Sequence, residues 1–257
     1  SYLMTEDLIN NKDIYFPSYL GSNDKLITLL NRTSKTLCNW FSNANKNGPL
    51  PFDENFKCMM PEEDGNSVED LFSEIKVLLN NSFNPVHPGS LAHLDPPPLI
   101  FSILGDLIAA GLNNNLLAYE LSPSVTLLED SLCKWFAKKI GFKDSAGGIA
   151  ASGGTLSNLN ALIAARHNAG LGSDPNSVLL VSEDAHSSFI KCIRIMGLHE
   201  DNLVRIKTNK KGSIDTQNLR KTIDKCSIDN KKIFAIVATL GTTVRGAIDP
   251  ITDISEI

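Results

Sequence analysis

A chain of 257 residues is long enough to bury a sizeable core. Its 42% hydrophobic and 21% charged residues are typical of a globular protein and exclude disorder on a large scale. The net charge of -5 leaves no basic excess to neutralise phosphates, so we expect no nucleic-acid partner.

No apolar run reaches the roughly 18 to 20 residues that a membrane span needs, and no secretory signal opens the sequence, so we expect no membrane partner. The five cysteines are widely spaced and include no C-x-x-C pair. This pattern is typical of reduced thiols and predicts a cytoplasmic protein. His87 and His93 have no further ligands at metal-binding spacing, so we predict no metal site.

Apolar residues recur at helical intervals over residues 24–45 and 67–80, which predicts two helices. Prolines between residues 85 and 98 then interrupt the pattern. We therefore predict an N-terminal helical segment over residues 1–84 and a second domain over residues 85–257. Its first clear helix covers residues 122–140, because Ser122 suits the N-cap, Pro123 the first turn and Gly141 the position past the end.

After Gly147 the sequence alternates between strand and helix patterns. Strands are predicted over residues 148–151, 178–182, 203–207 and 233–240, and helices over residues 155–168, 186–196 and 215–226. The last strand is a nearly continuous apolar run, so we expect it to be buried on both faces. The alternation predicts an α/β fold with a mainly parallel sheet.

Two glycines precede the helix predicted over residues 155–168. Gly153 and Gly154 would let the backbone approach an anion, and the helix start offers unpaired N–H groups beside the Thr155 hydroxyl. An ordinary strand-to-helix turn would use the same residues, so both interpretations stay open. A nucleotide P-loop is a weak match, because Gly154 stands where that motif needs lysine.

Two further polar segments follow predicted strands. His186 comes after the strand over residues 178–182, where its ring would stack on an aromatic ligand or serve as an ordinary helix-end residue. Thr242 and Thr243 follow the last strand, and their hydroxyls would face the same cleft. Alternatively, they belong to a capped turn that leads to Asp249, which would begin the next helix. Ligands collect beyond the carboxyl ends of parallel strands, so the three segments together favour one binding site.

Read together, Ser-Gly-Gly-Thr-Leu-Ser-Asn at 152–158, Asp-Ala-His-Ser-Ser at 184–188 and Ala-Thr-Leu-Gly-Thr-Thr at 238–243 resemble the group II pyridoxal-phosphate-dependent amino-acid decarboxylases. The resemblance extends over about residues 84–257. It implies the large domain of a PLP-dependent transferase of fold type I, with pyridoxal 5′-phosphate as cofactor, an amino acid as substrate and a homodimer as the assembly.

By this resemblance, several residues acquire roles. Gly153, Gly154 and Thr155 would hold the cofactor phosphate, His186 would stack on the pyridine ring, and Thr243 would bond near the ring or the substrate. His87, His93 and Leu94 would border the substrate mouth. The implied activity is that of a lyase in amino-acid and carboxylic acid metabolism, which converts an L-amino acid to an amine and carbon dioxide.

Two family elements match nothing in the 257 residues. They are the His-x-Asp-Ala-Ala segment, whose aspartate pairs with the pyridine nitrogen, and the His-Lys pair, whose lysine forms the Schiff base. We therefore expect the sequence to be the first part of a longer enzyme, with a sheet incomplete at its C-terminus and no activity of its own. An aminotransferase or other lyase of fold type I, and a non-catalytic remnant of the fold, remain alternatives.

Overall fold

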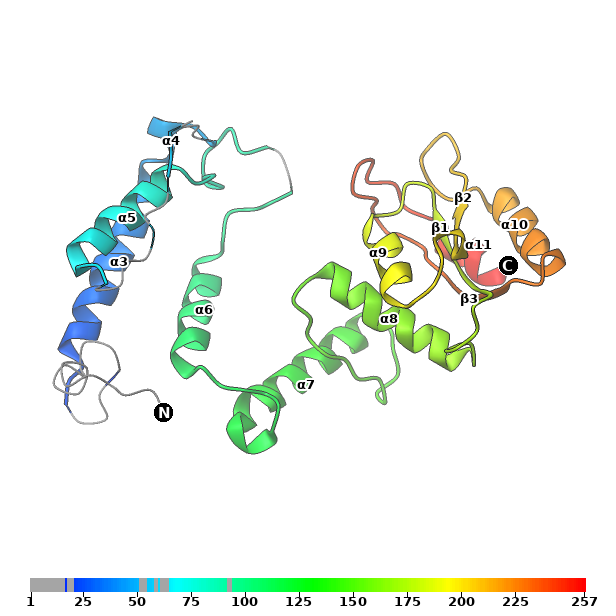
Figure 1. Cartoon of the computed structure of the whole chain (residues 1–257), viewed down its shortest axis with the longest axis horizontal. Coiled ribbons are helices and arrows are strands. Elements are labelled where there is room, and N and C mark those ends of the chain that lie inside the picture. The colour runs from blue at the N-terminus through cyan, green and yellow to red at the C-terminus, as the bar shows by residue number, and fades with distance from the viewer. Residues whose placement is uncertain (1–16, 18–20, 51–54, 58–59, 61–64, 92–93) are drawn as a thin grey trace. The chain divides into compact units, whose positions relative to one another are not determined.

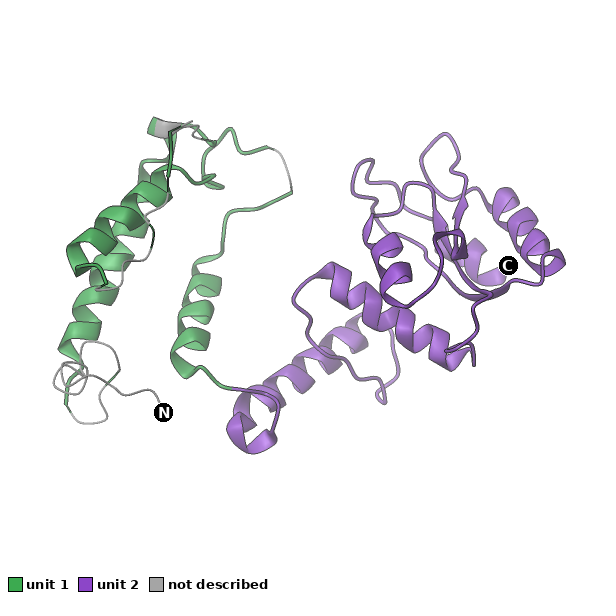
Figure 2. Ribbon diagram, viewed as in Figure 1, with its two compact units in different colours: residues 1–114 green, residues 115–257 purple. Residues whose placement is uncertain are grey.

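The computed structural model describes residues 17, 21–50, 55–57, 60, 65–91 and 94–257. The chain divides into two compact units, residues 1–114 and residues 115–257 (Figures 1 and 2). The domain division predicted after Asn84 stays a prediction. Within the described ranges, no helix has the length and apolar character needed to cross a membrane.

The described part of the first unit contains helices α3 (Asp24–Ser42), α4 (Ala44–Asn47), α5 (Val68–Asn80) and α6 (Ile100–Leu112). The helix predicted over residues 24–45 is thus interrupted at Asn43. Helix α5 begins where expected, because the Ser67 hydroxyl accepts a hydrogen bond from the Asp70 N–H at 3.1 Å.

Helices α3 and α5 are joined through Arg32. Its guanidinium donates two hydrogen bonds of 2.6 Å to the Glu69 carboxylate and lies 3.9 Å from the centre of the buried Phe72 ring. The hydrogen bonds from Arg32 hold the pKa of the Glu69 carboxyl below its ordinary value. Exposed ion pairs add little to folding stability, whereas burial of a Phe side chain contributes about 1.5 to 3 kcal/mol. Phe72 is therefore the stronger link.

The second unit has the predicted α/β arrangement. Its helices are η1 (Tyr119–Leu121), α7 (Pro123–Lys139), α8 (Gly154–Asn168), α9 (Ser188–Ile195), η2 (Glu200–Asn202), α10 (Thr216–Ile228) and α11 (Ile251–Glu256). Its strands are β1 (Ser177–Ser182), β2 (Leu203–Ile206) and β3 (Lys232–Ile236), which form a parallel sheet in the order β2-β1-β3. The predicted mainly parallel sheet is confirmed.

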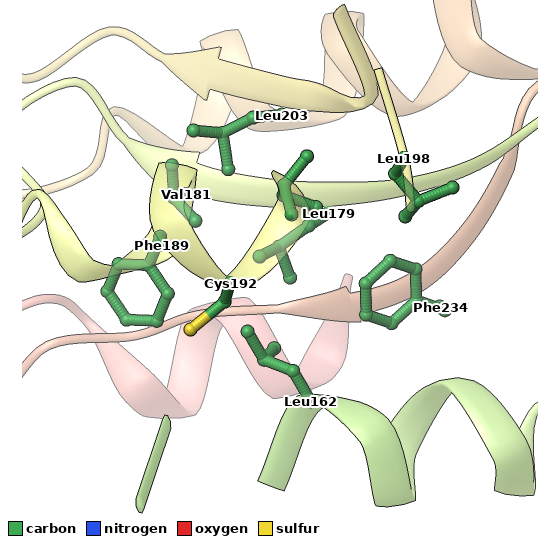
Figure 3. Close-up of a cluster of buried hydrophobic side chains, with 9 residues drawn as sticks. Leu162, Leu179, Val181, Phe189, Cys192, Leu198, Leu203 and Phe234 are labelled. Atoms are coloured by element: carbon green, nitrogen blue, oxygen red, sulfur yellow. The ribbon is translucent and has the colours of Figure 1, made fainter. Parts of the chain in front are cut away.

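The sheet separates two apolar clusters. On one face, Leu179 and Val181 of β1 pack with side chains of α8 and α9, as Figure 3 shows for Leu162 and Cys192. On the other face, Val178 and Leu180 pack with side chains of α10 and α11. Since successive strand residues point to opposite faces, one fully buried strand supplies both clusters.

Two strand predictions are wrong. Residues 148–151 are not a strand, because the described sheet offers them no partner; instead the Ala150 N–H donates to the Glu129 carboxylate of α7 at 2.7 Å. Strand β3 ends at Ile236, and at the sheet edge only its Phe234 is buried. The strand buried on both faces is β1, because it lies between the other two.

A buried arginine anchors the end of α8. Arg166 donates to the backbone oxygens of Leu171, Asp174 and Met196 at 2.9 to 3.2 Å and to the Ser177 hydroxyl at 3.0 Å. A buried guanidinium is costly unless it is hydrogen-bonded, and here these acceptors supply the bonds. The bonds join the end of α8 to the start of β1 and to the end of α9.

Candidate functional site

Three loops leave the same edge of the parallel sheet. Strand β1 ends at Ser182, β2 at Ile206 and β3 at Ile236, and the segments after them carry two of the three motifs. The glycine motif begins α8, although no strand precedes it in the structure.

The turn at Gly153 presents unpaired donors. Gly153 is the N-cap of α8, and its carbonyl accepts the Leu156 and Ser157 N–H groups, both at 3.1 Å. In the described residues, the N–H groups of Gly154 and Thr155 have no protein acceptor, and no side chain caps the helix. These donors and the positive end of the helix dipole together favour an anion.

Packing does not explain the two glycines at this turn. Gly153 has an extended backbone with φ 169°, and a Cβ added to Gly153 or Gly154 would meet no heavy atom within 4 Å. Neither a left-handed conformation nor a close neighbour therefore requires glycine here. Gly153, Gly154 and Thr155 are all exposed, so the turn that carries the two free donors lies at the surface of the described residues.

Side chains connect this turn to the second motif. The Asn158 amide donates to the Ser188 hydroxyl at 3.0 Å, and the Cys192 thiol donates to the Thr155 carbonyl oxygen at 3.8 Å. Burial raises the pKa of the Cys192 thiol, so this group stays protonated in its donor role. The start of α8 therefore packs beside the start of α9.

His186 lies in the turn before α9 and not inside the helix that was predicted from residue 186. Its Nδ1 accepts a hydrogen bond from the Ser188 N–H at 3.1 Å, so the neutral ring carries its proton on Nε2. The side chain is exposed. This contact orients the ring and gives His186 a helix-end role, while its exposed surface is free to meet a ligand.

The two threonines after β3 differ in environment. Thr242 is buried, and its hydroxyl accepts the Ala247 N–H at 3.0 Å, whereas Thr243 is exposed. Of the two hydroxyls expected at the cleft, the one on Thr242 is thus used to close the loop.

Asp249 has a function that the sequence did not indicate. Its buried carboxylate accepts the N–H groups of Ile214 and Thr239, both at 2.8 Å, so it ties the end of β3 to the loop after β2. It does not begin the next helix, since α11 starts after Pro250. An aspartate at a loop end reads as a cap in the sequence, and only the tertiary contacts reveal this role.

Ionic contacts join the loops to one another. Arg245 Nε lies 3.4 Å from Asp184 Oδ2, although this buried oxygen accepts no hydrogen bond from the described residues. The attraction is therefore electrostatic and lacks hydrogen-bond geometry. The Thr208 N–H and hydroxyl donate to the Glu183 carboxylate at 2.7 and 2.8 Å and hold the pKa of that carboxyl below its ordinary value.

Comparison with known proteins identifies the family. Residues 54–257 match the model of the pyridoxal-dependent decarboxylase conserved domain. The chain belongs to the pyridoxal-dependent decarboxylase family. The L-2,4-diaminobutyrate decarboxylase of Acinetobacter baumannii is 30% identical over 218 residues, which are 77% of this chain and 43% of the relative. The aromatic-L-amino-acid decarboxylase of Bacillus atrophaeus is 30% identical over 200 residues, which are 76% of this chain and 41% of the relative.

Solved structures of decarboxylases share the fold. The glutamate decarboxylase domain from the Vibrio parahaemolyticus diaminobutyrate enzyme superposes with a TM-score of 0.90 at 22% identity, over 97% of this chain and 58% of that one. Catharanthus roseus tryptophan decarboxylase gives a TM-score of 0.82 at 23% identity, over 93% of this chain and 55% of that one. The chain thus spans under half the length of the curated relatives named here and somewhat over half of these solved chains.

The donors at the site fit the cofactor of this family. A phosphate needs accessible hydrogen-bond donors, and the N–H groups of the exposed residues Gly154 and Thr155 meet that need. An aromatic ring needs a flat partner, and the exposed imidazole of His186 is one. Both features lie in the second unit, joined through α8 and α9.

The residues predicted at the substrate mouth belong to the first unit. His87 Nδ1 accepts the Gly89 N–H at 2.8 Å, and Leu94 is 80% exposed. His93 lies outside the described residues. The role of all three at a substrate site stays a prediction. Among the described residues, no group of three His, Cys, Asp or Glu side chains is placed to hold a metal ion.

Proposed function

We propose that the whole protein to which this chain belongs is a lyase that decarboxylates an L-amino acid with pyridoxal 5′-phosphate. In the reaction the bond from Cα to the carboxylate breaks, carbon dioxide leaves, and a proton takes its place on Cα. The observation that carries the proposal is the open glycine turn at α8, whose two unpaired N–H groups stand beside the His186 segment.

In this proposal the start of α8 binds the phosphate. The N–H groups of Gly154 and Thr155 donate to its oxygens, the Thr155 hydroxyl adds a donor, and Gly153 leaves room for the approach. The helix dipole contributes typically about 0.3 to 1 kcal/mol to such an anion. Several hydrogen bonds and one helix dipole would therefore act on the same phosphate.

His186 and Thr243 complete the proposed cofactor contacts. The Ser188 N–H fixes the His186 ring through Nδ1, so the imidazole is oriented before a ligand arrives. Exposed Thr243 offers a hydroxyl near the ring or the substrate. When bound, pyridoxal phosphate supplies an electron sink for the pair of electrons left on Cα. The chain's own contribution here is to bind and orient.

The substrate, assembly and location extend this proposal. The relatives are named for diaminobutyrate and for aromatic amino acids, which supports an L-amino acid as the substrate class. We place His87, His93 and Leu94 near its entrance. We further propose a cytoplasmic homodimer that acts in amino-acid metabolism.

The test compares two glycine variants of the whole protein. Gly154→Leu fills the open turn at the start of α8, while Gly172→Leu makes the same change beyond the other end of that helix, where a Cβ also meets nothing within 4 Å. We expect the pyridoxal-phosphate dissociation constant to rise about tenfold or more in Gly154→Leu, equivalent to about 1.4 kcal/mol, and to stay unchanged in Gly172→Leu.

Product analysis completes the test. Purified wild-type protein with pyridoxal phosphate should release carbon dioxide and the matching amine from at least one L-amino acid in a panel. Equal cofactor affinity in both glycine variants would remove the α8 turn as the phosphate site. Transfer of the amino group to a 2-oxo acid without carbon dioxide would favour an aminotransferase, and binding without turnover would favour a non-catalytic protein.

A further inference from the structure

Arg245 lies where the loops after all three strands meet. It belongs to the loop after β3, two residues beyond Thr243, and its Nε lies 3.4 Å from Asp184 Oδ2 in the loop after β1. Asp184 in turn lies two residues before His186. One side chain thus connects the segments that carry the two proposed ligand contacts.

The loop after β2 contacts Arg245 at Gly212. Gly212 closes a turn in which its N–H donates to the Asn209 carbonyl at 2.9 Å, and its φ is +82°. A Cβ at Gly212 would lie 2.9 Å from Arg245 Cδ and 3.3 Å from Ala247 Cβ. The stem of Arg245 therefore lies against Gly212, in space that a side chain at this position would need, so the loop after β2 borders this side chain.

The loop after β1 is held from two sides. On the β2 side, Thr208 donates to the Glu183 carboxylate, and the Arg205 guanidinium donates to the Glu183 backbone oxygen at 3.4 Å. On the β3 side, Arg245 supplies the charge opposite Asp184. Both neighbouring loops thus fix the segment that leads into His186.

We propose that Arg245 is a positioning residue that sets the His186 segment against the Thr243 loop through Asp184 and Gly212. This inference rests on the proposed function, which places both segments at the cofactor. Arg245 is 55% exposed in its side chain and Asp184 27%, and ion pairs of this exposure add little to folding stability. In this proposal the pair acts on the relative position of the two segments.

The test uses whole-protein variants and two readouts besides activity. These are the pyridoxal-phosphate dissociation constant and the visible circular dichroism of the bound cofactor, which reports its orientation. We expect Arg245→Ala to raise the dissociation constant about fivefold, equivalent to about 1 kcal/mol of coupling, and to change the dichroism. Arg245→Lys should recover part of the affinity, because it keeps the charge. Lys210→Ala, which removes an exposed cation from the same turn as Gly212, should match the wild type.

A double-mutant cycle separates positioning from a general loss of structure. Asp184→Asn removes the charge that faces Arg245, so it should weaken cofactor binding when Arg245 is present and much less once Arg245 is alanine. Fully additive effects, or an Arg245→Ala variant with affinity within twofold of the wild type and unchanged dichroism, would overturn the proposal. Thermal melting of the apoproteins identifies any variant that fails to fold. If Arg245→Ala fails to fold, the cofactor affinity and dichroism of Arg245→Lys decide the proposal instead. If the wild type binds no pyridoxal phosphate, the proposed function fails as well.

Discussion

The loop after β3 and the turn that opens α8 differ in whether their polar groups have hydrogen-bond partners. In the loop, Asp249 and Thr242 accept three backbone N–H groups, and both side chains are buried. At the turn, the N–H groups of Gly154 and Thr155 have no partner in the described residues. A segment that satisfies itself is a scaffold, whereas one that leaves donors unpaired and space open is suited to bind. Substitutions in the two segments should therefore affect different properties.

The largest effect should come from Asp249. Asp249→Ala leaves the buried Ile214 N–H and the partly buried Thr239 N–H without acceptors, and each such loss costs about 1 to 3 kcal/mol, so we expect about 3 kcal/mol less stability. Asp249→Asn keeps one acceptor oxygen and should lose about half as much. Urea denaturation measures both, and a loss below about 1 kcal/mol for alanine would show that the loop does not depend on this carboxylate.

The threonine pair should divide stability from ligand binding. Thr242→Val removes the acceptor for the Ala247 N–H, so we expect a loss of about 1 to 2 kcal/mol. Thr243→Val changes an exposed side chain and should keep stability within about 0.5 kcal/mol, while cofactor binding or turnover falls. Thermal melts and cofactor titrations of both variants make the comparison. The reverse pattern would mean that Thr242, not Thr243, serves the ligand.

A charge in the open turn should stabilise the apoprotein and weaken the site. Gly153→Asp supplies a carboxylate that caps the free N–H groups of α8, so we expect a gain of about 0.5 kcal/mol in stability. The same carboxylate repels the phosphate, and affinity for pyridoxal phosphate should fall about tenfold or more. Gly153→Ser caps without a charge and is the matched control. A stabilised Gly153→Asp variant with full affinity would place the phosphate elsewhere.

The smallest effect should be a local response to pH. Hydrogen bonds from Thr208 lower the pKa of Glu183, so this carboxylate stabilises the folded state above the unfolded pKa of about 4.3, and the contribution is lost as pH falls through the folded pKa. Protection of the Thr208 amide against hydrogen exchange should fall with it. In Glu183→Gln this protection should no longer depend on pH between about 5 and 3, because the amide does not titrate. Equal pH dependence in both proteins would exclude Glu183 as the cause.

Local patterns predicted most elements, because their signals act over a few residues. Pro123 at the start of α7, Gly141 past its end and the apolar periods of α3 and α5 were sufficient to place those helices. The prediction of which strand is buried on both faces was wrong for a different reason. The apolar run after Ile233 reads like a central strand, but β3 lies at an edge of the described sheet and β1 lies between two partners.

The features of the candidate site also divide into those set by local sequence and those set by tertiary contacts. The sequence by itself determined the family motifs, the α/β alternation and the glycine turn at α8, since these depend on residue type and spacing. Only the tertiary structure showed that Asp249 joins two loops and that Arg245 faces Asp184 across the sheet edge. It also showed that the Thr242 hydroxyl accepts a hydrogen bond from Ala247 within its own loop. The contacts of Asp249 with Ile214 and of Arg245 with Asp184 join residues far apart in the chain, and the strand order that brings the loops together decides these partners.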